Sequence, residues 1–232
     1  MKKNKIIFFV KTFEKKEYML DFLNGKLYLN KLSYFKKIEE ELENNRADEK
    51  EGLCAVFQAK NTKFEINGYQ LKDIVGPIEM KDPLIDNIHI LCLFAGSTNE
   101  DNIIEGNKFK RNKLDEIAKD LNISDNFKNL GKYCVLIHNT SKFIDRVVKT
   151  VKKLNYYAKA GLVKYYDYNS FNGSFQNLDA AFNKRNQYNH QKEYRFAIDT
   201  NNTVKEALVL DIGNIEDIAT QIDLTDLKIK FI

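Results

Sequence analysis

Tryptophan is absent from this 232-residue chain, which also has only 2 prolines, 10 glycines and 3 cysteines. The scarcity of proline and glycine argues against a linker-rich or low-complexity protein. No apolar run approaches the roughly 18 residues that a membrane-spanning helix needs. The apolar run at residues 6–10 ends at Lys11 without a signal-peptide cleavage site, so we interpret it as a buried strand. We therefore expect a cytoplasmic protein that makes no membrane contact.

Cysteine and histidine are too widely spaced for a recognisable metal site. The cysteines are Cys54, Cys92 and Cys134, and their apolar neighbours indicate reduced thiols in the core. The histidines stand at positions 89, 138 and 190, without H-x-x-x-H or H-x-E spacing. We expect no metal.

Three common catalytic and nucleotide-binding motifs are also missing. The chain has no G-x-x-x-x-G-K-[ST] loop, no G-x-G-x-x-G and no G-x-S-x-G. This excludes a P-loop nucleotidase, a Rossmann dinucleotide site and an α/β-hydrolase. The net charge of +4, from 37 basic and 33 acidic residues, is too mild to indicate nucleic-acid binding by itself.

What the chain does contain is typical of a folded α+β protein. Hydrophobic residues make up 43% and charged residues 30%, and the length suits one domain spanning residues 1–232. Apolar and alternating runs predict strands at 5–11, 26–30, 53–59, 63–67, 69–74, 88–94, 133–137, 160–168, 193–198, 208–211 and 227–232. Helical spacing predicts helices at 14–23, 33–43, 113–121 and 178–184, and another capped by Ser141. Because strands and helices lack a regular βαβ rhythm, we expect a mixed, mainly antiparallel sheet with flanking short helices.

The late segment at residues 188–196 is unusually polar for a strand. Period-two geometry places Glu193 and Arg195 on one face, with Tyr194 and Phe196 on the other. A carboxylate beside a guanidinium stays ionised at neutral pH. It can then orient a sugar hydroxyl or stabilise a cationic transition state. The alternative is a structural Glu–Arg pair at a strand end.

Two further charged stretches are open to a functional and to a structural interpretation. Arg46, Asp48 and Glu51 lie in a polar loop that could bind a polar ligand or a phosphate, or could be a solvated run of charge. Residues 142–164 are rich in lysine, with Tyr156-Tyr157 inside the stretch and Tyr165-Tyr166 directly after it. This stretch could face nucleic-acid phosphates, or could be an amphipathic helix with a basic solvent face.

Several short motifs, taken in their order along the chain, resemble a family of bacterial and phage proteins of undefined function. That family has a G-x-L-Y segment, an acidic loop and a late Y-x-x-E-x-E-Y/W-R strand. The resemblance runs along nearly the whole chain, although Arg46-Ala47-Asp48 and Gln191 differ from the family's Asn-Asp-Pro and first Glu. The matching stretches are residues 25–29 with Tyr34 and Phe35, then 48–52, 92–94, 131–135, 188–195 and 211–218.

The same layout is similar to ADP-ribosyltransferase-like folds. The resemblance puts Lys11 or Thr12 at the ligand position of the first strand and Ser97 at the hydroxyl position of a middle strand. It puts Glu193 at the catalytic position, where Gln191-x-Glu193 resembles the Q/E-x-E pattern. It implies NAD as the ligand, with Glu193 binding the nicotinamide ribose and stabilising an oxocarbenium-like transition state.

Three hypotheses follow from these observations. The first is a toxin-like or phage-conflict enzyme of ADP-ribosyltransferase type acting on NAD or another nucleotide. In it Glu193 is catalytic, Arg195 and Arg46 hold phosphates, and Tyr28 or Tyr34 stacks on a ring. The second is a non-catalytic inhibitor or sensor that binds a protein or a small molecule. The third is a nucleic-acid-binding or -processing protein that uses the lysine-rich stretch.

Overall fold

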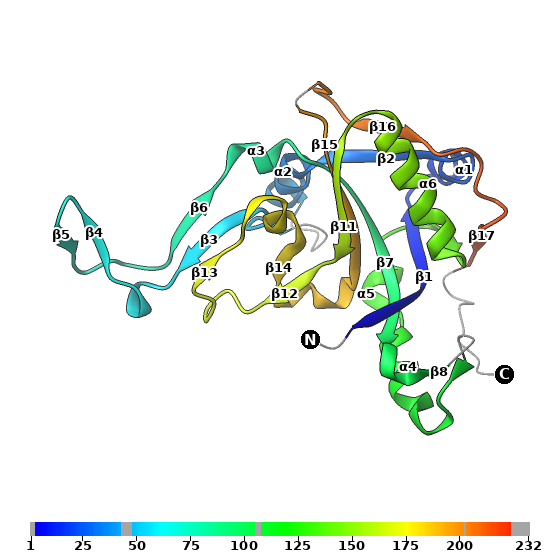
Figure 1. The fold of residues 1–232 in the computed structure, drawn as a ribbon, viewed down its shortest axis with the longest axis horizontal. Coiled ribbons are helices and arrows are strands. Elements are labelled where there is room, and N and C mark those ends of the chain that lie inside the picture. The colour runs from blue at the N-terminus through cyan, green and yellow to red at the C-terminus, as the bar shows by residue number, and fades with distance from the viewer. Residues whose placement is uncertain (1–2, 43–47, 105–107, 202, 224–232) are drawn as a thin grey trace.

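An eight-stranded, entirely antiparallel sheet forms the centre of the computed structural model, which describes residues 3–42, 48–104, 108–201 and 203–223 (Figure 1). Six strands follow the order β11-β15-β7-β1-β10-β17, and β2 and β16 join them through a pairing of β2 with β7. The strands are β1 (Asn4–Phe13), β2 (Lys26–Lys31), β7 (His89–Asn99), β10 (Tyr133–Ile137), β11 (Tyr157–Leu162), β15 (Glu193–Asp199), β16 (Leu208–Asp211) and β17 (Ala219–Ile222).

Smaller sheets and short helices surround this centre. The helices are α1 (Lys16–Leu23), α2 (Leu32–Leu42), α3 (Pro83–Asp86), α4 (Leu114–Leu121), α5 (Asp125–Lys128) and α6 (Thr140–Lys153). The 3₁₀ turns are η1 (Ala59–Asn61), η2 (Glu100–Asn102), η4 (Arg111–Lys113), η5 (Asn177–Phe182) and η6 (Asn186–Gln191). The outer strands are β3 (Leu53–Phe57), β6 (Ile78–Lys81) and β13 (Gly173–Ser174), then β4 (Phe64–Ile66) with β5 (Tyr69–Leu71), β8 (Ile103–Ile104) with β9 (Lys108–Phe109), and β12 (Lys164–Tyr166) with β14 (Asn183–Arg185). The predicted α+β class with a mainly antiparallel sheet is confirmed.

The sheet forks at β7. One edge of β7 pairs with β15 over residues 89–94. On its other edge, β1 pairs with residues 94–99 and β2 pairs with residues 89 and 90. The strands β1 and β2 therefore part beside residues 91–93. The amine Nζ of Lys11, from β1, donates a hydrogen bond to the Cys92 carbonyl at this fork, over 3.0 Å.

One face of the sheet carries the largest apolar core. The odd-numbered residues of β7 and the even-numbered residues of β15 point to this face, where α1 and α6 cover them. Alternation along each strand explains the arrangement, because successive side chains leave opposite faces. The helices contribute Met19, Phe22 and Leu23 from α1 and Phe143, Val147 and Val151 from α6.

The other face is divided. Ile90 and Ala197 join an apolar cluster under α2, α3 and η5, whereas Val10 and Phe94 join a second cluster with Ile123 and Phe127. The register pairs Ala197 with Ile90, Arg195 with Cys92 and Glu193 with Phe94. The alternation predicted for this strand is thus confirmed, and it puts two charged residues between two apolar clusters.

Several predicted element boundaries were wrong. β7 continues through Ala95 and Gly96 to Asn99, because these small residues allow close pairing with β1, and the Phe8 ring lies over Gly96. The helix α6 is capped by the Asn139 side chain, which accepts from the Lys142 amide, and not by Ser141. Residues 186–191 form a 3₁₀ turn, so only the second half of the polar segment is strand. The predicted strand at 227–232 lies outside the described residues.

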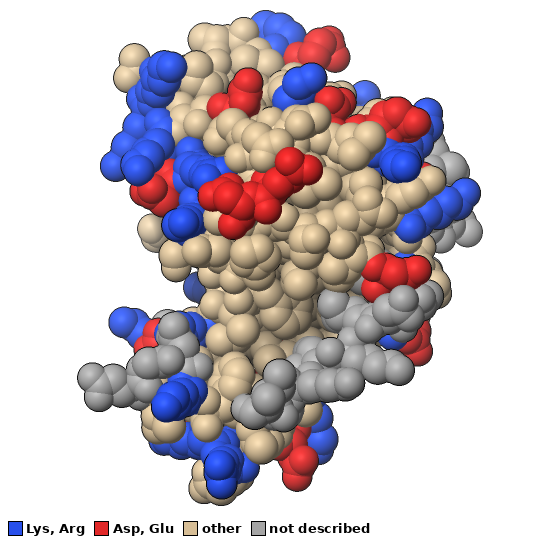
Figure 2. Space-filling view, turned by 90° about the vertical axis from the view of Figure 1, so that its right-hand side faces the viewer, with Lys and Arg blue, Asp and Glu red and all other residues tan. Residues whose placement is uncertain are grey.

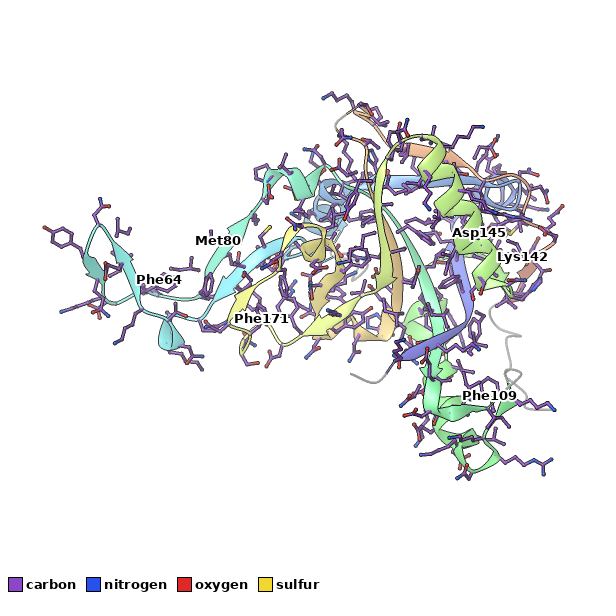
Figure 3. All side chains as sticks on the ribbon, viewed as in Figure 1. Phe64, Met80, Phe109, Lys142, Asp145 and Phe171 are labelled. Carbon is purple, nitrogen blue, oxygen red and sulfur yellow. The ribbon has the colours of Figure 1, made fainter. Side chains whose placement is uncertain are left out.

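A hairpin arm projects from one side of the molecule, with Phe64 on its strand β4 and Met80 on β6, the strand that follows the hairpin (Figure 3). Its turn, Asn67-Gly68, has positive φ at both residues, as the sequence predicts for a two-residue hairpin loop. Tyr69 is 79% exposed and Val75 is 99% exposed, so the arm offers apolar side chains to solvent. In the described part of the chain, no helix is both long and apolar enough to cross a membrane.

Candidate functional site

Glu193 and Arg195 point from β15 into the polar gap between the two apolar clusters. The chain enters the strand through Lys192, whose φ of 41° ends the preceding 3₁₀ turn. From there the extended backbone sends Glu193 and Arg195 to one face and the core residues Tyr194 and Phe196 to the other. The gap is therefore a direct consequence of a polar, apolar, polar, apolar order in the sequence.

Four buried charges meet in this gap in alternating order, and we call Glu51, Arg195, Glu193 and Lys184 the charge ring. The Arg195 Nε lies 2.8 Å from Oε2 of Glu193, and the Lys184 Nζ lies 2.8 Å from Oε1 of the same carboxylate. Glu51 closes the ring, because it accepts a hydrogen bond from Arg195 and lies 3.9 Å from the Lys184 Nζ. None of the four side chains is more than 9% exposed.

Opposite charges keep Glu193, Arg195 and Lys184 ionised in spite of burial. Burial by itself raises the pKa of Glu193, but Arg195 and Lys184 outweigh it and hold that pKa well below its usual range. Burial lowers the pKa of Arg195 and of Lys184, and the two glutamates raise both pKa values above their ordinary values. Glu193 is therefore a carboxylate at neutral pH, and its two partners are cations.

Neighbouring groups fix the two cations in place. Arg195 also donates to the Ala181 carbonyl over 2.6 Å, from its NH1 atom. Lys184 donates to the Gln191 side-chain oxygen over 2.6 Å and lies 4.9 Å from the centre of the Tyr188 ring. Such saturation is typical of buried charges, which are costly when a partner is missing.

A cavity of about 360 Å³ opens above the charge ring at the fork of the sheet. The polar part of its lining, which we call the floor, consists of the charge ring with Gln191, Cys92, Lys11 and Thr12. Tyr34 and Phe35 from α2 lie on its lining, and so do Phe127 and Leu130 from the α5 region. A concave site with apolar walls and a few convergent polar groups, in this range of volume, is the usual form of a small-molecule site.

The thiol of Cys92 faces this cavity as a neutral group. Burial raises the pKa of the Cys92 thiol to about 12, with Glu193 adding to the increase. A thiol with so high a pKa is a poor nucleophile at neutral pH. All three cysteines are free, as the sequence predicts.

Asp48 ties the loop that carries Glu51 to the strand that carries Lys184. Its carboxylate is 1% exposed and accepts hydrogen bonds from the Arg185 amide, over 3.0 Å, and from the Arg185 Nε, over 2.7 Å. It also accepts from the amide of Lys50. The buried Asp48 and the partly buried Arg185 therefore form a second ion pair beside the ring.

Six of the residues proposed from the sequence line the cavity together: Lys11, Thr12, Tyr34, Glu51, Glu193 and Arg195. They come from β1, α2, the loop before β3, and β15. Tyr34 is 46% exposed at the cavity and presents its ring to solvent. Asp48 lies behind the lining and supports it through Arg185.

The remaining proposed residues lie elsewhere. Tyr28 is 61% exposed on β2, where it pairs with Val209 of β16, so it does not line the cavity. Ser97 lies inside β7, on the opposite face from Phe94 and Cys92, because it is an odd number of residues away from both. Arg46 lies outside the described residues.

Lys184 is the site residue that sequence reasoning missed. The sequence predicted a helix over 178–184, but the chain forms the turn η5 and then the short strand β14, which pairs with β12 in parallel. The available signal was a lysine in a run that begins with Ala180, Ala181 and Phe182, all of which are buried. A lysine among buried residues requires a charged or polar partner.

Comparisons with known proteins add no assignment. No protein-family model, no curated protein and no solved structure matches the chain. Among the described residues, no group of three or more His, Cys, Asp or Glu side chains is placed to hold a metal ion.

Proposed function

We propose that the cavity binds a nucleotide such as NAD and that the protein is a toxin-like enzyme of ADP-ribosyltransferase type. One observation carries the proposal: Glu193 is an ionised carboxylate on the floor of a small-molecule-sized cavity. Cleavage of a glycosidic bond develops positive charge on the sugar ring, and a fixed carboxylate stabilises that charge. In this proposal Glu193 binds a ribose hydroxyl and stabilises the oxocarbenium-like transition state.

The remaining lining suits the other parts of such a ligand. The Lys11 amine lies on the floor at the fork, where it binds a phosphate of the ligand. Tyr34 and Phe35 offer aromatic surface to a planar ring, and their own rings are 5.7 Å apart and nearly perpendicular. Thr12 lines the cavity and supplies the hydroxyl group that the resemblance places on Ser97.

The charge ring also supports a second candidate, a binding module without catalysis. Both oxygens of Glu193 already have a cationic partner, as in a structural ion pair. A carboxylate has about four acceptor positions, so a ligand hydroxyl still has a place on it. In the non-catalytic alternative the cavity recognises its ligand and releases it unchanged.

The lysine-rich stretch gives less support to a nucleic-acid surface. Arg146 of α6 binds Asp217, Lys149 binds Asp145, and Lys159 of β11 binds Asp179. Lys142 and Asp145 lie toward the right-hand side in Figure 3, and Figure 2, which faces that side, shows Lys and Arg interspersed with Asp and Glu. Mixed charge of this kind favours the solvated helix face.

Radiolabelled NAD tests the enzymatic proposal. Purified protein is incubated with adenylate-labelled NAD, with and without cell lysate, and both label transfer and nicotinamide release are measured. We expect Glu193→Gln to lower either activity by roughly 100-fold or more, because it removes the charge that stabilises the transition state.

Glu65→Gln is the matched control, since Glu65 is exposed on the hairpin arm and the substitution is chemically identical. If the wild type turns over NAD and Glu193→Gln does so at the same rate, the enzymatic proposal is contradicted. NAD binding without turnover in the wild type, by calorimetry, would favour the binding module.

A further inference from the structure

Lys184 reaches Glu193 from a different element than Arg195 does. Arg195 lies two residues along the same strand, and it is shared between Glu193 and Glu51. Lys184 comes from β14, and its Nζ donates to Oε1 of Glu193, whereas Arg195 donates to Oε2. The two oxygens of Glu193 are thus held from two directions.

Holding both oxygens has a geometric consequence. The last torsion of a glutamate side chain is broad and weakly restrained, so a carboxylate fixed at one oxygen rotates about that bond. A second fixed oxygen defines the plane of the carboxylate. The Lys184 amine is itself fixed by the Gln191 oxygen at 2.6 Å and by the Tyr188 ring.

We propose that Lys184 is a positioning residue for Glu193: its ammonium group fixes the plane in which the carboxylate faces the cavity. This inference rests on the proposed function, in which Glu193 acts on the ligand. Lys184 acts through Glu193 and not on the reacting atoms. The geometry of the site therefore requires a cation at this position as well as the glutamate.

The charged and titratable groups around Glu193 determine how the loss of Lys184 changes the pKa of Glu193. The groups that face the carboxylate are Lys184 from β14, Arg195 from β15, Glu51 from the loop before β3, Cys92 from β7, Tyr165 from β12 and Lys11 from β1. Without Lys184, Glu193 and Glu51 share Arg195 alone. The effect of burial, which raises the pKa of Glu193, is then no longer fully offset. We then expect the pKa of Glu193 to rise by roughly 1–3 pH units, the usual effect of one nearby opposite charge.

Carbon NMR of protein labelled at the glutamate carboxyl groups measures this directly. The Glu193 signal is identified by its loss in Glu193→Gln, and its pH midpoint is followed in wild type, Lys184→Met and Lys184→Arg. Lys149→Met is the control, because Lys149 is 75% exposed on α6 and pairs with Asp145. We expect the midpoint to rise in Lys184→Met and to stay at the wild-type value in Lys184→Arg and Lys149→Met.

If Lys184→Met does not fold, a double variant tests the inference in its place. Glu51→Gln with Lys184→Met removes one charge of each sign, so Glu193 and Arg195 remain as a neutral pair. We expect the Glu193 midpoint to be higher in this variant than in Glu51→Gln alone, since its Oε1 has lost the ammonium group. A midpoint in Lys184→Met equal to that of the wild type, or, if that variant does not fold, a midpoint in the double variant equal to that of Glu51→Gln alone, overturns the inference.

The titration needs no ligand, so it separates this inference from the proposed function. If the midpoint moves but NAD is neither cleaved nor bound, Lys184 positions Glu193 and the proposed function fails. If NAD is cleaved in a Glu193-dependent manner and the midpoint does not move, the function stands and the role of Lys184 fails.

Discussion

Single residues at the cavity and directly behind its lining carry charge into the interior of this protein. Asp48, Glu51 and Glu193 are balanced there by Lys184, Arg185 and Arg195, one cation for each carboxylate. Removing one member of such a set leaves its partner as an uncompensated charge, which costs far more than the loss of a surface pair. Sequence reasoning could propose Glu193 with Arg195, because alternation along one strand puts them together. It could not supply Lys184, whose hydrogen-bond partners Gln191 and Glu193 lie seven and nine residues away along the chain, on other elements.

Asp48→Asn tests this difference between buried and surface pairs. Asp48 is 1% exposed and accepts from the amide and the Nε of Arg185, so we expect the free energy of unfolding to fall by about 1–3 kcal/mol. Asp21→Asn is the control, because Asp21 is 53% exposed and pairs with Lys26 on the surface. We expect less than about 1 kcal/mol from the control. Urea unfolding of both variants gives the two values, and equal losses would contradict the structural role of Asp48.

Elements were predicted best where a periodic pattern repeats over several residues. The strands β1, β10, β15 and β16 and the helices α1, α2 and α4 all occur where the pattern predicts them. Errors lie where small or polar residues depend on a distant neighbour. The continuation of β7 past Phe94 depends on β1, and the strand β14 depends on β12. Neither pairing is visible in the local pattern, although the pattern predicts a strand at each partner.

Gly96→Ala tests the dependence of β7 on β1. A methyl group at Gly96 would lie 2.3 Å from the Phe8 ring, so either the ring or the strand must move. We expect the free energy of unfolding to fall by about 1–3 kcal/mol, the usual cost of overpacking. Gly161→Ala is the matched control in the same sheet, because a methyl group there meets nothing within 4 Å.

Thermal and urea unfolding compare the two alanine variants. We expect Gly161→Ala to be neutral or slightly stabilising, since glycine weakens a strand. Gly96→Ala combined with Phe8→Leu should recover part of the lost stability, because leucine has no ring over the strand. A Gly96→Ala protein as stable as Gly161→Ala would contradict the close packing of Phe8 on β7.

At the scale of the whole molecule, the cavity is made by a fork in one sheet. Its lining residues come from β1 and β7, from α2, from the loop before β3, from the α5 region, and from β14, η6 and β15. The order of strands β15-β7-β1 brings Glu193 and Lys11, far apart along the chain, onto one floor. The resemblance to ADP-ribosyltransferase-like folds named both residues, but composition and periodicity alone could not bring them together.

A crystal structure of Glu193→Gln with bound NAD tests whether the cavity is a nucleotide site, because this variant is expected to bind the nucleotide without cleaving it. We predict a ribose hydroxyl within hydrogen-bond distance of residue 193, a phosphate near the Lys11 amine, and a planar ring against Tyr34. NAD bound away from the fork, or a cavity that stays without ligand at saturating NAD, would contradict the account.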